Sequence, residues 1–128
     1  MITKVRSVGM YVADQQRARD FYTEVLGCEL VADVPMGEEE GAPRWIEVRF
    51  RDDETRLILF TPPGQEDRIG TFSNLIVHCD DIERTYEELS AKGVEFTTTP
   101  ERAEWGQWWA VFKDSEGNQI GLGLESEG

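Results

Sequence analysis

Hydrophobic and polar positions alternate at the beginning of the chain, which predicts a half-buried strand over residues 4–12. The apolar residues of one face of this strand are Val8, Met10 and Val12. A helix is predicted next, from the N-cap Asp14 to Gly27. Its apolar residues recur at helical spacing: Ala18, Phe21, Tyr22, Val25 and Leu26. Three strand-like runs follow between turn residues: CELVADV, RWIEVRF and TRLILFT.

The second half of the chain repeats this order of elements. An offset of 67 residues aligns Ser7 with Asn74 and Asp14 with Asp81. Residues 73–79, SNLIVHC, alternate again, with Leu75, Val77 and Cys79 on one face and Asn74, Ile76 and His78 on the other. A helix capped by Asp81 is expected to end at Gly93. The runs VEFTTTP, GQWWAVFKD and NQIGLGL complete the repeat.

The repeat predicts an α+β fold made of two tandem βαβββ modules. The first module covers residues 1–61, a linker covers 62–71, and the second module covers 72–128. One helix can cover only one face of a four-stranded sheet, so the open face must pack on a neighbour or line a cavity. We therefore expect the modules to form a curved mixed sheet around a cleft. The open sheet edges and faces also favour a homodimer.

Length and charge narrow the classes of function. The 128 residues are typical of one domain, and 26 acidic against 13 basic residues give a net charge of −13. Such a surface repels phosphate backbones and anionic lipids, so neither nucleic acid nor membrane is an expected partner, whereas cationic ligands are attracted. The beginning of the chain has no apolar stretch typical of a signal peptide, and the cysteines Cys28 and Cys79 are too few for a disulfide framework. We expect a reduced, cytoplasmic protein.

Three segments carry a resemblance to a known family. They are VGMYVADQQRARDFYTEVLG at 8–27, NLIVHCDDIERTYEELSAKGVEF at 74–96 and FKDSEGNQIGL at 112–122. Together with the repeat, they resemble the vicinal oxygen chelate superfamily, which includes glyoxalase I, extradiol dioxygenases and bleomycin resistance proteins. The resemblance covers nearly the whole chain. It implies the glyoxalase/bleomycin resistance/dioxygenase fold and a homodimer.

The resemblance also implies a metal site of four inward side chains, two histidines and two glutamates. In this chain those places fall on Ser7, Ile58, Asn74 and Gly121. None offers an imidazole or a carboxylate, so we expect neither a metal nor another cofactor. Glu47 and His78 form only a weak alternative pair, and the cysteines are expected to be unreactive.

Aromatic residues remain as candidates for ligand contact. Strand alternation directs Trp109 away from the helix-covered face, and Trp45 shares a face with Glu47. An aromatic cleft edged by acids suits a flat, cationic or amphipathic ligand. The predicted ligand-binding residues are Ser7, Trp45, Glu47, Arg56, Ile58, Phe60, Asn74, Trp105, Trp109 and Gly121. Three alternatives stay open: the tryptophans fill a dimer interface, Arg56 and Arg49 hold a carboxylate or phosphate in the cleft, or these arginines pair with Glu47 across adjacent strands.

Two functions are consistent with these residues. The first is a metal-free protein that binds an aromatic or cationic small molecule, resembling bleomycin resistance proteins. The alternative is a lyase, isomerase or dioxygenase of the same superfamily, with displaced metal ligands or with metal-independent acid–base catalysis. Glu47 and His78 are then the candidates for proton transfer. Because every expected ligand position lacks a metal-binding side chain, the binding function is preferred.

Overall fold

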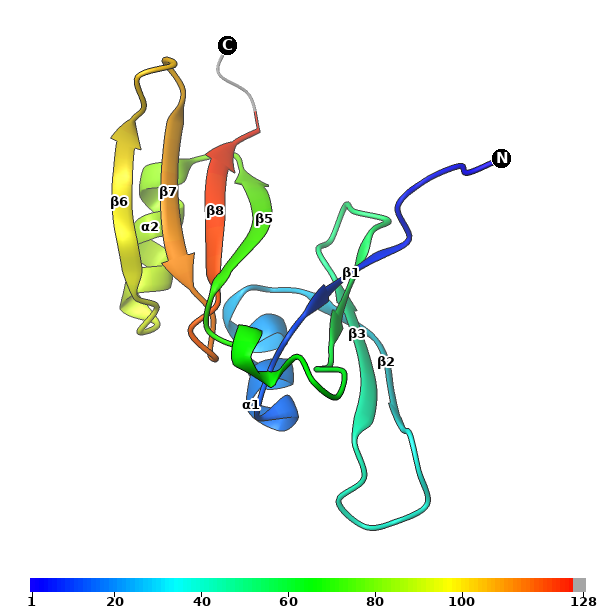
Figure 1. The fold of residues 1–128 in the computed structure, drawn as a ribbon. Coiled ribbons are helices and arrows are strands. Elements are labelled where there is room, and N and C mark those ends of the chain that lie inside the picture. Colours follow the sequence, from blue (N-terminus) through cyan, green and yellow to red (C-terminus); the bar gives the residue numbers. More distant parts are fainter. Residues whose placement is uncertain (126–128) are drawn as a thin grey trace. The chain divides into compact units, whose positions relative to one another are not determined.

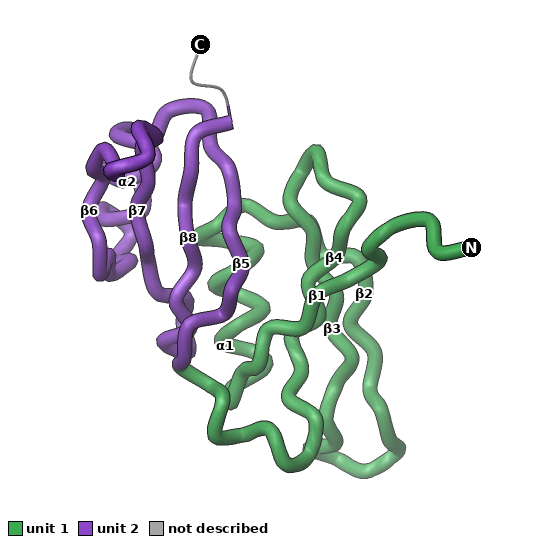
Figure 2. Tube along the Cα trace, turned by 45° about the horizontal axis from the view of Figure 1, so that its top comes forward, with its two compact units in different colours: residues 1–70 green, residues 71–128 purple. Residues whose placement is uncertain are grey.

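The computed structural model describes residues 1–125 and divides into two units. Unit 1 comprises Met1–Gly70 and unit 2 comprises Thr71–Gly128, so the division falls inside the predicted linker (Figure 2). Each unit contains one four-stranded sheet with a helix on one face (Figure 1). The predicted pair of βαβββ modules is confirmed.

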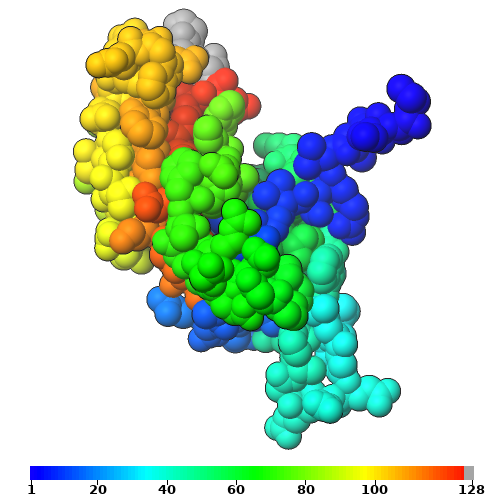
Figure 3. Space-filling view, in the orientation of Figure 1, coloured from blue at the N-terminus to red at the C-terminus, as the bar shows by residue number. Residues whose placement is uncertain are grey.

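Unit 1 contains the elements predicted from the first half of the repeat. They are β1 (Ser7–Met10), α1 (Gln15–Asp20), β2 (Glu29–Pro35), β3 (Arg44–Arg49) and β4 (Arg56–Leu59). The strand order is β1-β4-β3-β2, in which β1 and β4 are parallel and the other pairs antiparallel. Residues 1–6 and the loop between β2 and β3 project from the body of the unit (Figure 3).

The first helix differs in one respect from the prediction. Asp14 caps it as expected, accepting a hydrogen bond of 3.0 Å from the backbone N–H of Arg17. After α1, however, the chain widens into a π-helical turn over Phe21–Val25, closed by a 3.1 Å bond from Leu26 N to Phe21 O. Hydrophobic spacing does not distinguish such a turn from an α-helix. Its residue Tyr22 is fully buried, as it would be in either kind of helix. Gly27 then ends the helical segment with a φ of 79°.

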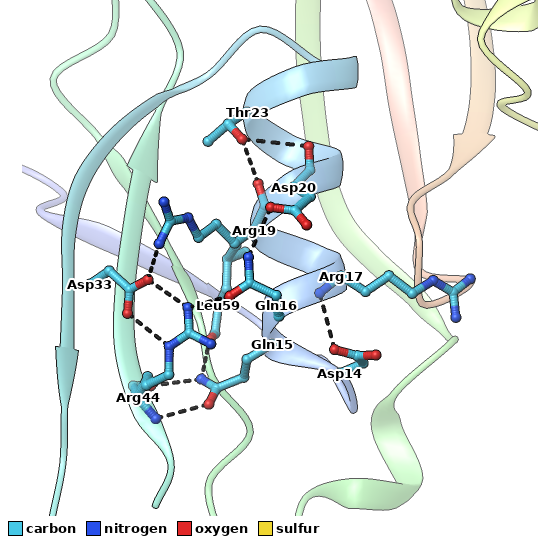
Figure 4. Close-up of polar contacts among 10 residues, drawn as sticks. All are labelled: Asp14, Gln15, Gln16, Arg17, Arg19, Asp20, Thr23, Asp33, Arg44 and Leu59. Carbon is cyan, nitrogen blue, oxygen red and sulfur yellow. Dashed lines mark hydrogen bonds and ion pairs between the residues drawn. The ribbon is translucent and has the colours of Figure 1, made fainter. Parts of the chain in front are cut away.

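Side chains hold α1 against its sheet (Figure 4). The Gln15 amide donates to the carbonyl oxygens of Arg44, on β3, and Leu59, on β4, at 2.6 and 2.8 Å. Its oxygen accepts from the backbone N–H of Arg44 at 2.9 Å. Asp33, on β2, accepts from both Arg44 and Arg19. The hydrogen bonds from Arg44 are the main cause that lowers the pKa of Asp33, against the opposing effect of burial.

Unit 2 repeats the topology of unit 1. It contains β5 (Phe72–Cys79), α2 (Ile82–Ala91), β6 (Phe96–Arg102), β7 (Trp108–Lys113) and β8 (Gln119–Leu124). The order is β5-β8-β7-β6, with β5 and β8 parallel. Asp81 caps α2 through the backbone N–H of Arg84 at 3.0 Å, and Gly93 follows the helix with a φ of 90°. Both ends of this helix are as predicted.

The helix-covered face of each sheet forms the core of its unit. In unit 1, Ile46 and Val48 are fully buried on this face, and in unit 2 Phe112 and Ile120 are. The alternation predicted for residues 73–79 is confirmed, because Leu75, Val77 and Cys79 are half-buried and the residues between them exposed. No helix within residues 1–125 is long and apolar enough to cross a membrane.

Candidate functional site

The strand register within each sheet shows which residues of the two modules occupy equivalent positions. In unit 1, Ile58 lies opposite Gly9 on one side and Glu47 on the other. In unit 2, Gly121 lies opposite Ile76 and Val111 in the same way. Ile58 is therefore the counterpart of Gly121. Two residues further along the chain, Phe60, which directly follows β4, is the counterpart of Gly123 in β8.

The open face of unit 1 contains a buried carboxylate, Glu47, which is only 5% exposed. Trp45 Nε1 donates to its Oε2 at 2.8 Å, and Arg56 Nη1 donates to its Oε1 at 3.1 Å. Arg6 Nη2 lies 3.4 Å from both carboxylate oxygens. The cross-strand pair of Arg56 and Glu47, an alternative that the sequence left open, is thus formed, whereas Arg49 pairs with Glu29 instead. Arg6, just before β1, joins the pair of Arg56 and Glu47 with a side chain that stays 62% exposed.

These contacts fix the charge of Glu47. Burial acts to raise its pKa, but the hydrogen bonds from Trp45 and Arg56 and the charge of Arg6 outweigh burial, so the pKa lies below its ordinary value. A general base needs a pKa near the working pH and a free lone pair directed at the substrate. Glu47 is instead a stable anion between two guanidinium groups. This environment favours a structural role over proton transfer.

Aromatic packing fills the remainder of this face. The rings of Trp45 and Phe60 are 6.1 Å apart between centroids, with an interplanar angle of 46°. Ile58, which lies between Arg56 and Phe60 in the alternation along the chain, is buried. Five of the predicted ligand-binding residues are brought together here: Trp45, Glu47, Arg56, Ile58 and Phe60. Trp45 contacts both Glu47 and Phe60, and Glu47 also contacts Arg56.

Unit 2 has a cavity at the equivalent face, with a volume of about 430 Å³. We call it the tryptophan cavity. Its lining includes Phe72, Ile76, His78, Trp105, Gln107, Trp108, Trp109, Val111, Gly121, Leu122, Gly123, Leu124 and Glu125. Its size falls in the range of pockets that bind drug-sized molecules. Four residues singled out in the sequence lie here, namely His78, Trp105, Trp109 and Gly121, whereas Asn74 does not line it.

Two tryptophans form one wall of the tryptophan cavity. The rings of Trp105 and Trp109 are 5.9 Å apart between centroids and tilted by 50°. Trp105 is 66% exposed, so most of its ring is free to contact another molecule. Opposite this wall, on the far side of β8, stand Ile76 and His78 of β5. An apolar surface with one exposed and one half-buried indole ring can bind an aromatic or cationic group by stacking.

Carboxylates lie at the edge of the tryptophan cavity. Glu125 belongs to its lining. A second hollow of about 270 Å³ shares Trp108 and Leu124 with the cavity and is lined by Asp80, Asp81 and Glu83. The carboxylate of Asp81 already caps α2, but its charge still contributes to the local potential. The surroundings of the cavity are therefore acidic.

The positions where the resemblance expects metal ligands do not fit a metal ion. In unit 1, Ile58 is buried and apolar, and Ser7 has only a hydroxyl. In unit 2, Gly121 has no side chain, and Asn74 is exposed in a bulge of β5 with a φ of 64°. Within residues 1–125, no three His, Cys, Asp or Glu side chains come together in a way that could hold a metal.

Neither cysteine has the environment of a nucleophile. Cys28 is buried, and burial raises its pKa to about 12. Burial also raises the pKa of Cys79, whose Sγ lies 3.5 Å from the carbonyl oxygen of Gly123. Both thiols stay protonated at neutral pH.

Several residues of the tryptophan cavity were not predicted from the sequence. Gly123, Ile76 and Val111 face it although none carries a reactive group. The run GLG at 121–123 contained a signal, because two glycines separated by one residue leave one face of a strand bare. Arg6 could not be found in this way, since its contact with Glu47 depends on tertiary structure.

Comparison with known proteins places the chain in a family. The model of the glyoxalase/bleomycin resistance protein/dioxygenase superfamily matches residues 4–122. The chain belongs to this superfamily. Among curated relatives, the uncharacterized protein YetH of Bacillus subtilis (strain 168) is 38% identical over 118 residues, covering 92% of this chain and 95% of the relative.

Solved structures of the superfamily agree with the fold. A member from Sphaerobacter thermophilus DSM 20745 is 33% identical, with a TM-score of 0.86, over 97% of this chain and 98% of its own. TnmS3, an antibiotic binding protein from Streptomyces sp. CB03234, is 31% identical, with a TM-score of 0.81, over 98% of both chains. The predicted glyoxalase/bleomycin resistance/dioxygenase fold is confirmed.

Proposed function

We propose that this superfamily member binds an aromatic, positively charged small molecule in the tryptophan cavity and needs no metal to do so. The observation that carries the proposal is the cavity itself, in which the exposed Trp105 ring and the half-buried Trp109 ring offer stacking surface. The net charge of −13 and the carboxylates near the cavity favour a cation over an anion. TnmS3, an antibiotic binding protein, is a precedent for small-molecule binding among similar chains.

The absence of suitable donors at Ser7, Ile58, Asn74 and Gly121 supports binding without a metal. Stacking and charge attraction require no Lewis acid, and the cavity offers both. The enzymatic alternative is less well supported. Of its two candidate proton-transfer residues, Glu47 is held by Arg56 and Trp45, which leaves His78 without the partner that the alternative needs.

The test is a calorimetric titration with proflavine, a flat three-ring cation. We expect binding to the full chain, and we expect Trp109→Leu to weaken it by about tenfold or more because the stacking wall is lost. The control Trp45→Phe alters a tryptophan of unit 1 and should leave the affinity unchanged. Affinity should fall as salt is added, because part of the attraction is between exposed charges.

Metal dependence is measured in the same titration. Proflavine affinity should be equal after dialysis against a chelator and after addition of zinc or nickel. A wild-type chain that binds no proflavine, or that binds it only with metal added, contradicts the proposal. Equal losses in Trp109→Leu and Trp45→Phe would show that the ligand does not bind where we place it.

A further inference from the structure

Strand β8 contains two glycines on the side of the tryptophan cavity, Gly121 and Gly123. The residues between and before them, Leu122 and Ile120, are buried in the core. Glycine in a strand costs stability and usually marks a bulge, an unusual backbone angle or a close approach by another molecule. The register between β7 and β8 runs without a shift, and neither glycine has a positive φ. The backbone of β8 therefore does not itself require glycine.

The neighbours of the two glycines differ. A Cβ atom built on Gly121 would lie 3.2 Å from Cγ1 of Ile76, so packing against β5 partly explains this glycine. A Cβ atom on Gly123 would meet only the ring of His78, at 3.5 Å from Cδ2 and 3.8 Å from Nε2. That is ordinary van der Waals contact. Apart from the adjacent residues of the chain, no other heavy atom lies within 4 Å of this Cβ position, although Trp109 lies directly opposite Gly123 in the sheet.

The other module shows what this position holds when it is filled. Trp45 of unit 1 and Trp109 of unit 2 have the same place in their sheets, two residues before the partners of Ile58 and Gly121. In unit 1 the Trp45 ring packs on Phe60, with centroids 6.1 Å apart. In unit 2 the tryptophan is present, but Gly123 stands in the place of the phenylalanine. Trp109 packs on Trp105 from the side of the β6–β7 loop, but the position that corresponds to Phe60 holds no ring.

We propose that a ring of the ligand supplies this second ring. It lies over Gly123 and against Trp109, where the side chain of Phe60 lies against Trp45 in unit 1. The inference rests on the proposed function and specifies the class of ligand: a flat, fused-ring aromatic cation. A flat ring can rest on the bare backbone of β8, with His78 on one side and Trp109 on the other. A molecule whose rings are twisted like a propeller cannot lie against that backbone.

The decisive variant is Gly123→Phe, which gives unit 2 the residue that unit 1 has. We expect it to lower the affinity for proflavine by roughly tenfold or more, because its own ring occupies the ligand's place. Gly123→Ala, whose methyl group makes only ordinary contacts, should lower the affinity by a few-fold. The matched control is Gly9→Ala in unit 1, where a Cβ atom would lie 3.6 Å from Tyr11 and no positive φ is involved. It should bind proflavine like the wild type.

A second probe tests the shape of the ligand. Tetraphenylphosphonium has the charge of proflavine, but its rings are not coplanar, and we expect the wild type to bind it at least tenfold more weakly. Equal binding of the two cations, or full proflavine affinity in folded Gly123→Phe and Gly123→Ala, overturns the inference and leaves the proposed function standing. No binding of either cation by the wild type overturns both. Circular dichroism is used to check that each variant is folded. If Gly123→Phe does not fold, the proflavine affinity of Gly123→Ala tests the inference.

Discussion

The two modules share one topology but use their open sheet faces in opposite ways. In unit 1 the face is filled by its own side chains, with Phe60 packed on Trp45 and a carboxylate satisfied by two arginines. In unit 2 the corresponding strand carries glycines, and a cavity of about 430 Å³ lies above it. The comparison teaches that a repeat can keep its core residues and strand register while only one copy keeps room for another molecule.

Alanine at the two corresponding positions should separate the modules most clearly. Phe60→Ala removes a half-buried ring from Trp45 and should lower the free energy of unfolding by roughly 2 kcal/mol. Gly123→Ala fits existing space and relieves a strand glycine, so it should change that free energy by less than about 0.5 kcal/mol or raise it slightly. Urea denaturation measures both. Equal destabilisation by the two substitutions would contradict the description of a filled face in unit 1 and an empty face in unit 2.

The buried carboxylate gives the second test. Glu47→Gln loses charge-assisted hydrogen bonds to Arg56 and Arg6 and should cost about 1–2 kcal/mol near neutral pH. The lowered pKa of Glu47 contributes stability above the ordinary glutamate pKa, and this contribution is lost as pH falls through the lowered value. Melting temperatures measured from pH 6 down to pH 3 should therefore decline less steeply in Glu47→Gln than in the wild type. Proflavine binding at neutral pH should not change.

A loss of binding in stable Glu47→Gln would link this carboxylate to the ligand site. An unchanged slope of melting temperature against pH would contradict the role of Glu47 as a stabilising anion. The double variant Glu47→Gln, Asp33→Asn extends the test, since hydrogen bonds from Arg44 lower the pKa of Asp33 in the same unit. The melting temperature of this double variant should decline even less steeply as the pH falls.

The smallest effect is expected where the modules are alike. Arg49 bonds to Glu29 in unit 1, and Lys113, at the equivalent register position, pairs with Glu95 in unit 2, both at 3.0 Å. Each pair is largely exposed, so Arg49→Ala and Lys113→Ala should each change the free energy of unfolding by less than about 0.5 kcal/mol. Added salt should reduce even that difference. A large change in the free energy of unfolding in only one variant would show that the modules also differ at these exposed ion pairs.

Local signals made much of the fold predictable. Asp14 and Asp81 cap helices because a short carboxylate before an amphipathic run satisfies the first backbone amides, and alternation assigned the faces of β5. The π-helical turn at Phe21–Val25 was missed, because apolar spacing is compatible with either helix.

The candidate site was harder to predict for a different reason. Alternation directed Trp109 to the open face, but the sequence could not show which face is filled. That depends on pairs such as Trp45 with Phe60 and on contacts of residues distant in the chain, such as Arg6 with Glu47. Conversely, the space above Gly123 is an absence of side-chain atoms, which motifs do not report.

The parallel pairing of β5 with β8 has a kinetic consequence. These strands are the first and last of unit 2, and Ile76 meets Gly121 across about 45 residues of intervening chain, so their contact closes the module and is the most non-local in its sheet. The walls of the tryptophan cavity exist only after this closure. A bound molecule would therefore hold β5 and β8 together. Its binding would slow the exchange of amide hydrogens with solvent more along β5 and β8 than along β6 and β7.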